Sequence, residues 1–211
     1  MCFLDFLECI EKTLVQGKFT SDSIIYLKDD TQGIIDSVLA FASGEPDGQL
    51  RSDCKLRRFN LASFRFGSKN DQISDEEFKK KKGTKVTDIH LGSHTEIYTI
   101  VGKFYIEMMN EILKQKSMEK VWFIPALVYD KWKLFDATVE TTLAVLNTCW
   151  RSIYEFYLVP KDFSWLVHYE HHHNIYFLGN EIANAATNRW DRRRWKDKIL
   201  NHAFFPADTK K

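Results

Sequence analysis

Hydrophobic residues follow helical spacing at the start of this chain and then change to a strand pattern. Apolar positions recur every three or four residues over residues 1–16, which predicts an amphipathic helix. Residues 24–27 are a short apolar, branched run that predicts a strand. Asp30 or Thr31 can cap a second helix that runs to about Ala42. The first part of the chain therefore predicts two helices separated by a strand.

Two further helices are predicted in the middle of the chain. Ser93 and Glu96 have the spacing of a capping box, and apolar residues then recur at helical spacing to about Lys116. A second helical run occupies residues 136–153. Because the apolar positions of both runs fall on one side, each helix is expected to pack on a core.

Three runs before and between these helices have the composition of strands. Residues 121–129 and 131–135 predict a hairpin, and Pro125 places its first strand near an edge or a bulge. Residues 56–67 alternate aromatic residues with arginines. This alternation is typical of a half-buried strand, and it is also compatible with a platform for single-stranded nucleic acid. We favour the strand, since no RNA-binding consensus accompanies it.

The stretch 154–179 is the most informative part of the sequence. Residues 156–159, 165–170 and 175–178 are aromatic and branched runs bounded by turn-forming residues, so they predict three strands. Their connections are too short for a parallel crossover, which predicts an antiparallel meander. The expected fold class is α+β, an antiparallel sheet with a C-terminal three-strand meander packed by amphipathic helices.

Length and charge narrow the classes of protein to consider. At 211 residues the chain suits a single α+β domain over residues 1–211, with an internal boundary, if one exists, in the polar loop 67–88. The formal net charge is +1, which does not point to nucleic acid, a membrane or an acidic partner. No run approaches the ~20 apolar residues that span a bilayer.

The cysteines bear on the compartment. Cys2, Cys9, Cys54 and Cys149 are scattered without a C-x-x-C pair, and the first residues lack the basic start of a secretory leader. These features predict reduced thiols in a cytoplasmic protein. We interpret Cys149 as a small buried hydrophobic residue and not as a nucleophile.

Alternation along the second meander strand brings polar side chains together. It places Trp165 and Tyr169 on the core face, and it places His168 and Glu170 together on the opposite face. A turn with further histidines follows. A carboxylate beside several imidazoles can bind a divalent metal such as zinc, and the metal ligands would be His168, Glu170, His172 and His173. The alternatives are a solvent-exposed hairpin end and an edge that binds a partner.

The C-terminal region carries the strongest local charge. Asn180 can cap a last helix, and its basic residues within ten positions are Arg189, Arg192, Arg193, Arg194, Lys196 and Lys198. Basic residues late in a helix complement its dipole. Trp190 and Trp195 among them also suit recognition of an acidic surface, and the helix is a second candidate for binding nucleic acid.

Common catalytic signatures are missing from the sequence. It contains no P-loop, dinucleotide fingerprint, G-x-S-x-G elbow or H-E-x-x-H motif. His168-Tyr169-Glu170 satisfies half of a zinc deaminase signature, but the P-C-x-x-C half is missing. We therefore assign no catalytic and no cofactor-binding residue.

One resemblance adds to this picture. Trp165-Leu166, then Glu170-x-His172-His173, a hydrophobic strand and Gly179 resemble the W-L-x-x-E-x-H-H signature of small uncharacterised bacterial families, some of them found beside polymorphic-toxin immunity proteins. This chain has three residues between Leu and Glu where the signature has two, which is the spacing of a bulge. The resemblance implies that Trp165, Glu170, His172 and His173 belong to the defining feature of these families, and it brings no catalytic role. Together with the missing catalytic motifs it favours a bacterial protein whose partner is a cognate protein such as a toxin.

The expected function is therefore a non-catalytic, immunity-type interaction protein of the cytoplasm. Its interaction candidates are Trp165, Glu170, His172, His173, Trp190, Arg193 and Trp195. The first alternative is a metal-dependent hydrolase or metal-binding protein, with Glu170 as the base. The second alternative is nucleic-acid binding through residues 189–198.

Overall fold

The computed structural model describes residues 3–29, 31–43, 61–65, 105–127, 132–170 and 174–189. Helices and strands alternate along them, in the order α1 (Phe3–Gly17), β1 (Ile24–Leu27), α2 (Gln32–Ser43), β2 (Leu61–Arg65), β3 (Lys120–Leu127), β4 (Leu134–Thr138), α5 (Val139–Cys149), β5 (Ile153–Pro160), β6 (Leu166–Glu170), β7 (Asn174–Leu178) and α6 (Asn180–Arg189). Residues 105–112 are also helical. Short 3₁₀ turns occupy Ser21–Ser23, Lys114–Lys116 and Trp150–Ser152.

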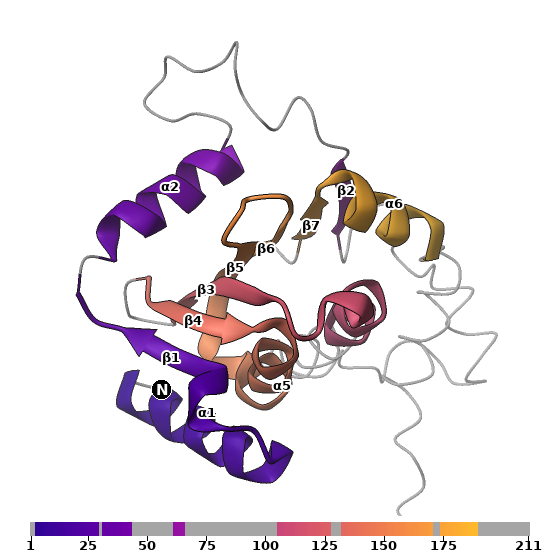
Figure 1. Cartoon of the computed structure of the whole chain (residues 1–211). Coiled ribbons are helices and arrows are strands. Elements are labelled where there is room, and N and C mark those ends of the chain that lie inside the picture. The colour runs from indigo at the N-terminus through magenta and orange to yellow at the C-terminus, as the bar shows by residue number, and fades with distance from the viewer. Residues whose placement is uncertain are drawn as a thin grey trace, which may run out of the picture.

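The seven described strands form one sheet in the order β1-β4-β3-β5-β6-β7-β2 (Figure 1). Every neighbouring pair is antiparallel. β5, β6 and β7 are consecutive both in the chain and in the sheet, so the predicted meander is confirmed. The α+β fold class is confirmed with it. The two strands at the ends of the sheet, β1 and β2, both come from the N-terminal third of the chain.

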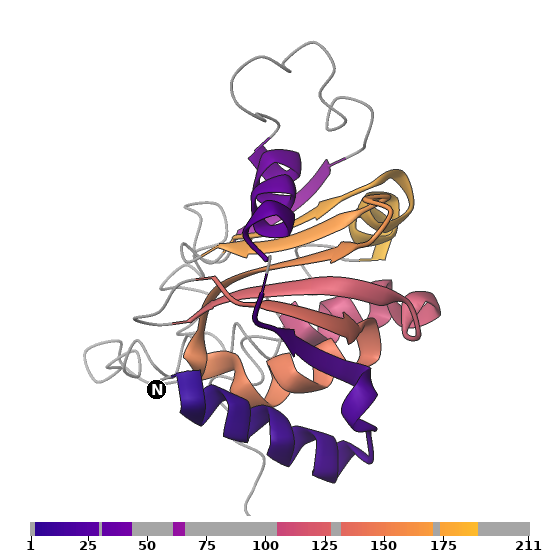
Figure 2. The same cartoon turned by 60° about the vertical axis from the view of Figure 1, so that its left-hand side comes forward.

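Each face of the sheet has its own hydrophobic core, because side chains alternate along every strand. The larger core joins alternate strand residues such as Phe123, Phe156 and Val167 to buried residues of α1, α5, α6 and the helix at 105–112. The smaller core joins Tyr157 and other residues of the opposite face to α2. Figure 2 shows α1 and α5 side by side below the strands, with α2 above them.

The predicted β3–β4 hairpin is present, but its boundaries differ from the prediction. β3 lies inside the sheet, and its register with β5 shifts between Ala126 and Leu127, so the bulge expected near Pro125 is observed. β4 extends to Thr138, and the helix predicted from residue 136 begins at Val139. The Thr138 side chain accepts a hydrogen bond from the Thr141 backbone N–H at 3.2 Å, which caps α5.

Several predictions fall partly or wholly beyond the described residues. Within the strand predicted over 56–67, the structure describes residues 61–65, which form β2. Within the helix predicted over 93–116, it describes residues from 105 onward, and residues 105–112 are helical. The polar stretch 67–88, where an internal boundary was expected, lies outside them. Strands from both sides of this stretch nevertheless belong to the same sheet. None of the helices within the described ranges is both long and apolar enough to traverse a bilayer.

The expectation of reduced thiols is wrong for Cys9 and Cys149, whose sulfur atoms form a disulfide bond. The two cysteines are 140 positions apart in sequence, but the packing of α1 on α5 brings their Cα atoms to 6.3 Å. That separation lies within the range that a disulfide requires. Cys149 is buried as predicted, at 2% exposure.

Candidate functional site

The polar face of the meander gathers side chains from three adjacent strands. His168 of β6 is paired directly with Tyr157 of β5 and with Tyr176 of β7. Residues that face each other across antiparallel strands lie on the same side of the sheet, so the three rings stand in a row. Glu155 and Glu170 lie two positions from Tyr157 and His168 along their strands and therefore share that side. The predicted pairing of His168 with Glu170 on one face is confirmed by this register.

Ring stacking continues across the sheet in both directions from His168. The imidazole lies 4.1 Å from the Tyr157 ring centroid at an interplanar angle of 14°, and 5.6 Å from the Tyr176 centroid at 21°. Tyr157 in turn contacts the ring of Trp132 at 5.2 Å. We call Trp132, Glu155, Tyr157, His168, Glu170 and Tyr176 the His168 cluster. Stacking fixes the planes of the His168, Tyr157 and Tyr176 rings relative to one another.

A short hydrogen bond fixes the imidazole further. His168 Nε2 lies 2.8 Å from Glu155 Oε1, and their side chains are 17% and 18% exposed. A carboxylate at one ring nitrogen favours the tautomer that carries a proton on that nitrogen. The pair is partly accessible and held in a single orientation.

The surroundings of the His168 cluster also change the pKa of Tyr157. Burial raises the pKa of its phenol well above the usual range, and the negative charges of Glu155 and Glu170 raise it further. The hydroxyl therefore stays protonated at neutral pH. Tyr157 acts here as a neutral ring with a polar edge, and it does not supply a phenolate.

The opposite side of the same strands makes this site rigid. Tyr169 and Phe156 are fully buried, and their rings stack at 5.7 Å. Trp150 contacts the Tyr169 ring at 4.8 Å and that of Phe156 at 6.1 Å. Close packing of this kind resists displacement of the strands. The His168 cluster is thus preorganised by the core behind it.

Trp165 is buried and contributes to the packing of the fold. Its side chain is only 3% exposed, and its Nε1 donates to Glu119 Oε1 at 3.3 Å. Gly179 lies against it, because a β-carbon built at Gly179 would be 2.8 Å from the Trp165 Cβ. The tryptophan and the glycine of the signature therefore pack together at the end of the meander. As an interaction candidate Trp165 is out of reach of a partner.

The structure describes only some of the other site residues that the sequence predicts. Glu170 is half-buried in the His168 cluster. His172, His173, Trp190, Arg193 and Trp195 lie outside the described residues. Within the described ranges, no three His, Cys, Asp or Glu side chains are arranged to hold a metal ion. The basic segment 189–198 is described only at its first residue, where α6 ends.

Sequence reasoning missed four members of the cluster. Tyr157, Trp132 and Tyr176 were treated only as parts of predicted strands, and Glu155 precedes the strand predicted over 156–159. The signal for two of them was available, because Glu155 and Tyr157 alternate along the strand expected to pair with His168. The register of the paired strands decides which residues face His168, and local sequence patterns do not predict register to a single residue.

A second charged group lies on the same face toward the β5–β6 turn. Lys161 forms an ion pair with Asp136, and its Nζ lies 4.2 Å from the ring centroid of Trp122. Lys120 Nζ lies 3.7 Å from the other Asp136 oxygen. The Asp136 carboxylate thus bridges Lys120 at the start of β3 and Lys161 just after β5. We therefore treat this group as part of the fold and not as a binding site.

Comparison with known proteins gives one match. The model of a family of unknown function, DUF6756, matches residues 72–189, which is more than half of the chain. The matched region includes β3 to β7 and the whole His168 cluster. Searches of curated proteins and of solved structures gave no significant match.

Proposed function

The chain belongs to DUF6756, a family of unknown function, and on the geometry of the His168 cluster we propose that it is a non-catalytic protein that binds another protein. The observation that carries this proposal is the partly exposed imidazole of His168, which is hydrogen-bonded to Glu155 and stacked between two tyrosine rings. Rigid aromatic groups with polar edges are the usual energetic centres of protein interfaces.

The chemistry of the cluster supports binding over catalysis. The phenol of Tyr157 stays protonated, so it is not a base at neutral pH. The Nε2 atom of His168 is already engaged by Glu155. What remains for a partner is the partly exposed rings of His168 and Tyr176, since Tyr157 itself is buried. Preorganised groups of this kind lose little conformational entropy on binding.

We further propose that the partner is a cognate toxin and that the protein acts as an immunity-type inhibitor in the cytoplasm. The support is the resemblance of Trp165, Glu170, His172 and His173 to the signature found beside immunity proteins. In this proposal the His168 cluster covers a functional surface of the toxin. Trp165 supports the strand that presents the cluster.

The test is a binding measurement with the product of the neighbouring gene. We expect wild-type protein and Met118→Ala to bind it equally, because Met118 is 75% exposed and lies outside the cluster. We expect His168→Ala and Tyr176→Ala to weaken binding at least about tenfold, the effect of losing an interface anchor. Circular dichroism and thermal melting establish that each variant is folded. Unchanged affinity of both cluster variants would remove this face from the proposal.

A metal-dependent hydrolase is the second candidate. It is favoured by the shared face of His168 and Glu170, directly before the histidines at 171–173. Metal-bound histidines commonly donate their second N–H to a carboxylate, which Glu155 could accept from His168 Nε2. A metal-bound water would be the nucleophile, with Glu170 as base. Tag-free protein without stoichiometric zinc, manganese or iron, and without a thermal shift on their addition, would exclude this candidate.

A further inference from the structure

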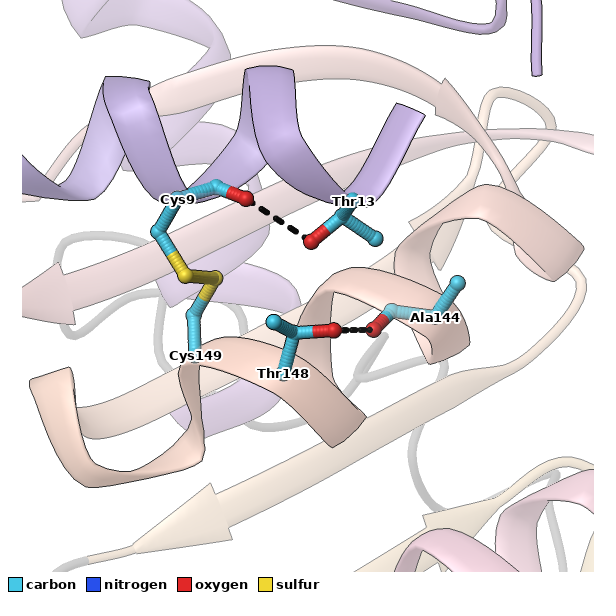
Figure 3. The surroundings of a disulfide bond; sticks show 5 residues. All are labelled: Cys9, Thr13, Ala144, Thr148 and Cys149. Atoms are coloured by element: carbon cyan, nitrogen blue, oxygen red, sulfur yellow. Dashed lines mark hydrogen bonds between the residues drawn. A yellow bond between two sulfur atoms is a disulfide. The ribbon is translucent and has the colours of Figure 1, made fainter. Parts of the chain in front are cut away.

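The disulfide bond between Cys9 and Cys149 joins two helices from distant parts of the chain. Cys9 lies in the middle of α1, and Cys149 is the last residue of α5 (Figure 3). The family match covers α5 but begins well after α1. The bond therefore fastens an N-terminal helix onto the region that the family shares.

Besides this bond, α1 is held by an apolar stripe, and Lys133 Nζ lies 4.6 Å from the centroid of its Phe3 ring. Phe6 and Ile10 are buried, and the Phe6 ring lies 6.0 Å from that of Phe135 on β4. The opposite side of the helix faces solvent, with Val15 80% exposed and Leu4 68% exposed. Such a helix is peripheral, since one stripe of side chains makes its contact with the core.

The hydroxyl groups near the bond do not connect the two helices. Thr13 donates to the carbonyl oxygen of Cys9 at 2.8 Å, and Thr148 donates to that of Ala144 at 3.0 Å (Figure 3). Each of these hydrogen bonds stays within its own helix. The two sulfur atoms form a covalent link that crosses from α1 to α5.

A short connection to β1 lies directly after α1. The helix ends at Gly17, and Lys18 takes a left-handed conformation with φ of 55°. Residues 18–23 then lead into β1, which is hydrogen-bonded to β4. Rotation of a few backbone angles at this point would move α1 without disturbing the sheet. It would uncover Phe135 and the side of α5 that α1 covers.

We propose that Cys9–Cys149 is a redox-sensitive clasp that holds α1 closed on α5. Cys9 is half-buried whereas Cys149 is buried, so the thiolate of a dithiol reductant attacks the Cys9 sulfur. The S–S bond breaks, Cys149 leaves as a thiolate and takes up a proton, and Cys9 forms a mixed disulfide with the reductant. The second thiol of the reductant then releases Cys9 as a thiol. Two electrons pass to the protein, and the reductant becomes a cyclic disulfide.

Reduction has a specific consequence for α1. While the clasp is intact, α1 cannot leave α5, because the bond tethers its middle. After reduction, noncovalent contacts alone restrain the helix, and its open state becomes accessible. Disulfides in reducing compartments are usually transient and redox-sensing, so in the cytoplasm this bond would report the thiol status of its surroundings.

Hydrogen exchange of the full chain, read by mass spectrometry before and after dithiothreitol, tests the clasp. We expect amides of residues 3–17 to exchange at least about tenfold faster after reduction, while those of residues 153–170 are unchanged. Cys2→Ser/Cys54→Ser should respond like wild type, which assigns the effect to the remaining pair. Cys9→Ser/Cys149→Ser should exchange rapidly at residues 3–17 with or without the reductant.

Three outcomes would overturn the inference. Alkylation of air-oxidised protein at both Cys9 and Cys149 would show that the bond does not form. Equal exchange of residues 3–17 in the two redox states would show that the bond does not restrain α1. Faster exchange in every element after reduction would show global destabilisation and no local opening.

Discussion

Gly179 packs directly on Trp165, so closely that a β-carbon at Gly179 would come within 2.8 Å of the Trp165 Cβ and 3.1 Å of its Cα. The glycine has a φ of +125°, which L side chains rarely adopt. It joins β7 to α6 at this point, and its carbonyl accepts the Ala183 N–H at 2.9 Å. The end of the meander therefore requires glycine both for space and for backbone conformation.

This contact predicts a large effect of a small substitution. We expect Gly179→Ala to lower the free energy of unfolding by about 2–4 kcal/mol, combining backbone strain with overpacking. Gly33→Ala is the matched control, because nothing lies within 4 Å of a β-carbon there and the residue is in α2. We expect the control to change stability by less than about 1 kcal/mol, in the stabilising direction. Urea denaturation measures both, and equal effects would contradict the contact.

The hydrogen bond between Glu155 and His168 should be measurable as a coupling energy. A double-mutant cycle with Glu155→Ala and His168→Ala should give about 0.5–1.5 kcal/mol of coupling in the free energy of unfolding, as expected for a partly buried hydrogen bond. Chemical denaturation of the four proteins at neutral pH provides the values. Strict additivity of the two losses would mean that the bond does not contribute.

Tyr157 predicts how stability depends on alkaline pH. Its pKa is raised in the folded protein by burial first, then by Glu155 and Glu170. Above about pH 10 the unfolded chain releases this proton while the folded chain keeps it, so stability falls as pH rises. We expect unfolding free energies measured from pH 8 to 12 to fall less steeply for Tyr157→Phe than for wild type. Parallel stability curves for the two proteins would show that folding does not raise the pKa of the Tyr157 phenol.

Phe156 should be among the most sensitive positions of the larger core. It is fully buried, and it contacts the rings of Tyr169, Trp150 and Phe123. We expect Phe156→Ala to cost about 3–5 kcal/mol of unfolding free energy, the usual cost of an aromatic cavity. Met118→Ala, on a side chain that is 75% exposed, should change it by less than about 0.5 kcal/mol. A cost of the same size at both positions would contradict this assignment of the core.

The predictability of this fold from sequence varied between its elements for physical reasons. The meander was predictable because its turns are short and its strands are bounded by Pro160 and Gly179. The start of α5 was misplaced because Asp136 resembles a helix start, whereas Phe135 and Ala137 continue into the larger core and Thr138 provides the cap. Residues 136–138 pair with β1 and β3, and this pairing outweighs the local preference for a helix start.

Long-range contacts were beyond the reach of local patterns. Cys9 and Cys149 are 140 positions apart, and no local pattern indicates that α1 packs on α5, so their disulfide bond was not predicted. The pairing of β2 with β7 joins residues more than 100 positions apart and was likewise not expected. The alternation along β6 did predict that His168 and Glu170 share a face. Its neighbours in the His168 cluster depended on cross-strand register.

The positions of β1 and β2 in the sheet affect how this family can be studied. The residues that match the family supply β3 to β7, whereas the outermost strand at each end comes from earlier in the chain. A fragment trimmed to residues 72–189 would bare the backbone amides of β4 on one side and of β7 on the other. Bare strand edges recruit further strands, so such a fragment would self-associate and precipitate. Recombinant fragments of this chain should accordingly begin upstream of β1 and not at the boundary of the shared region.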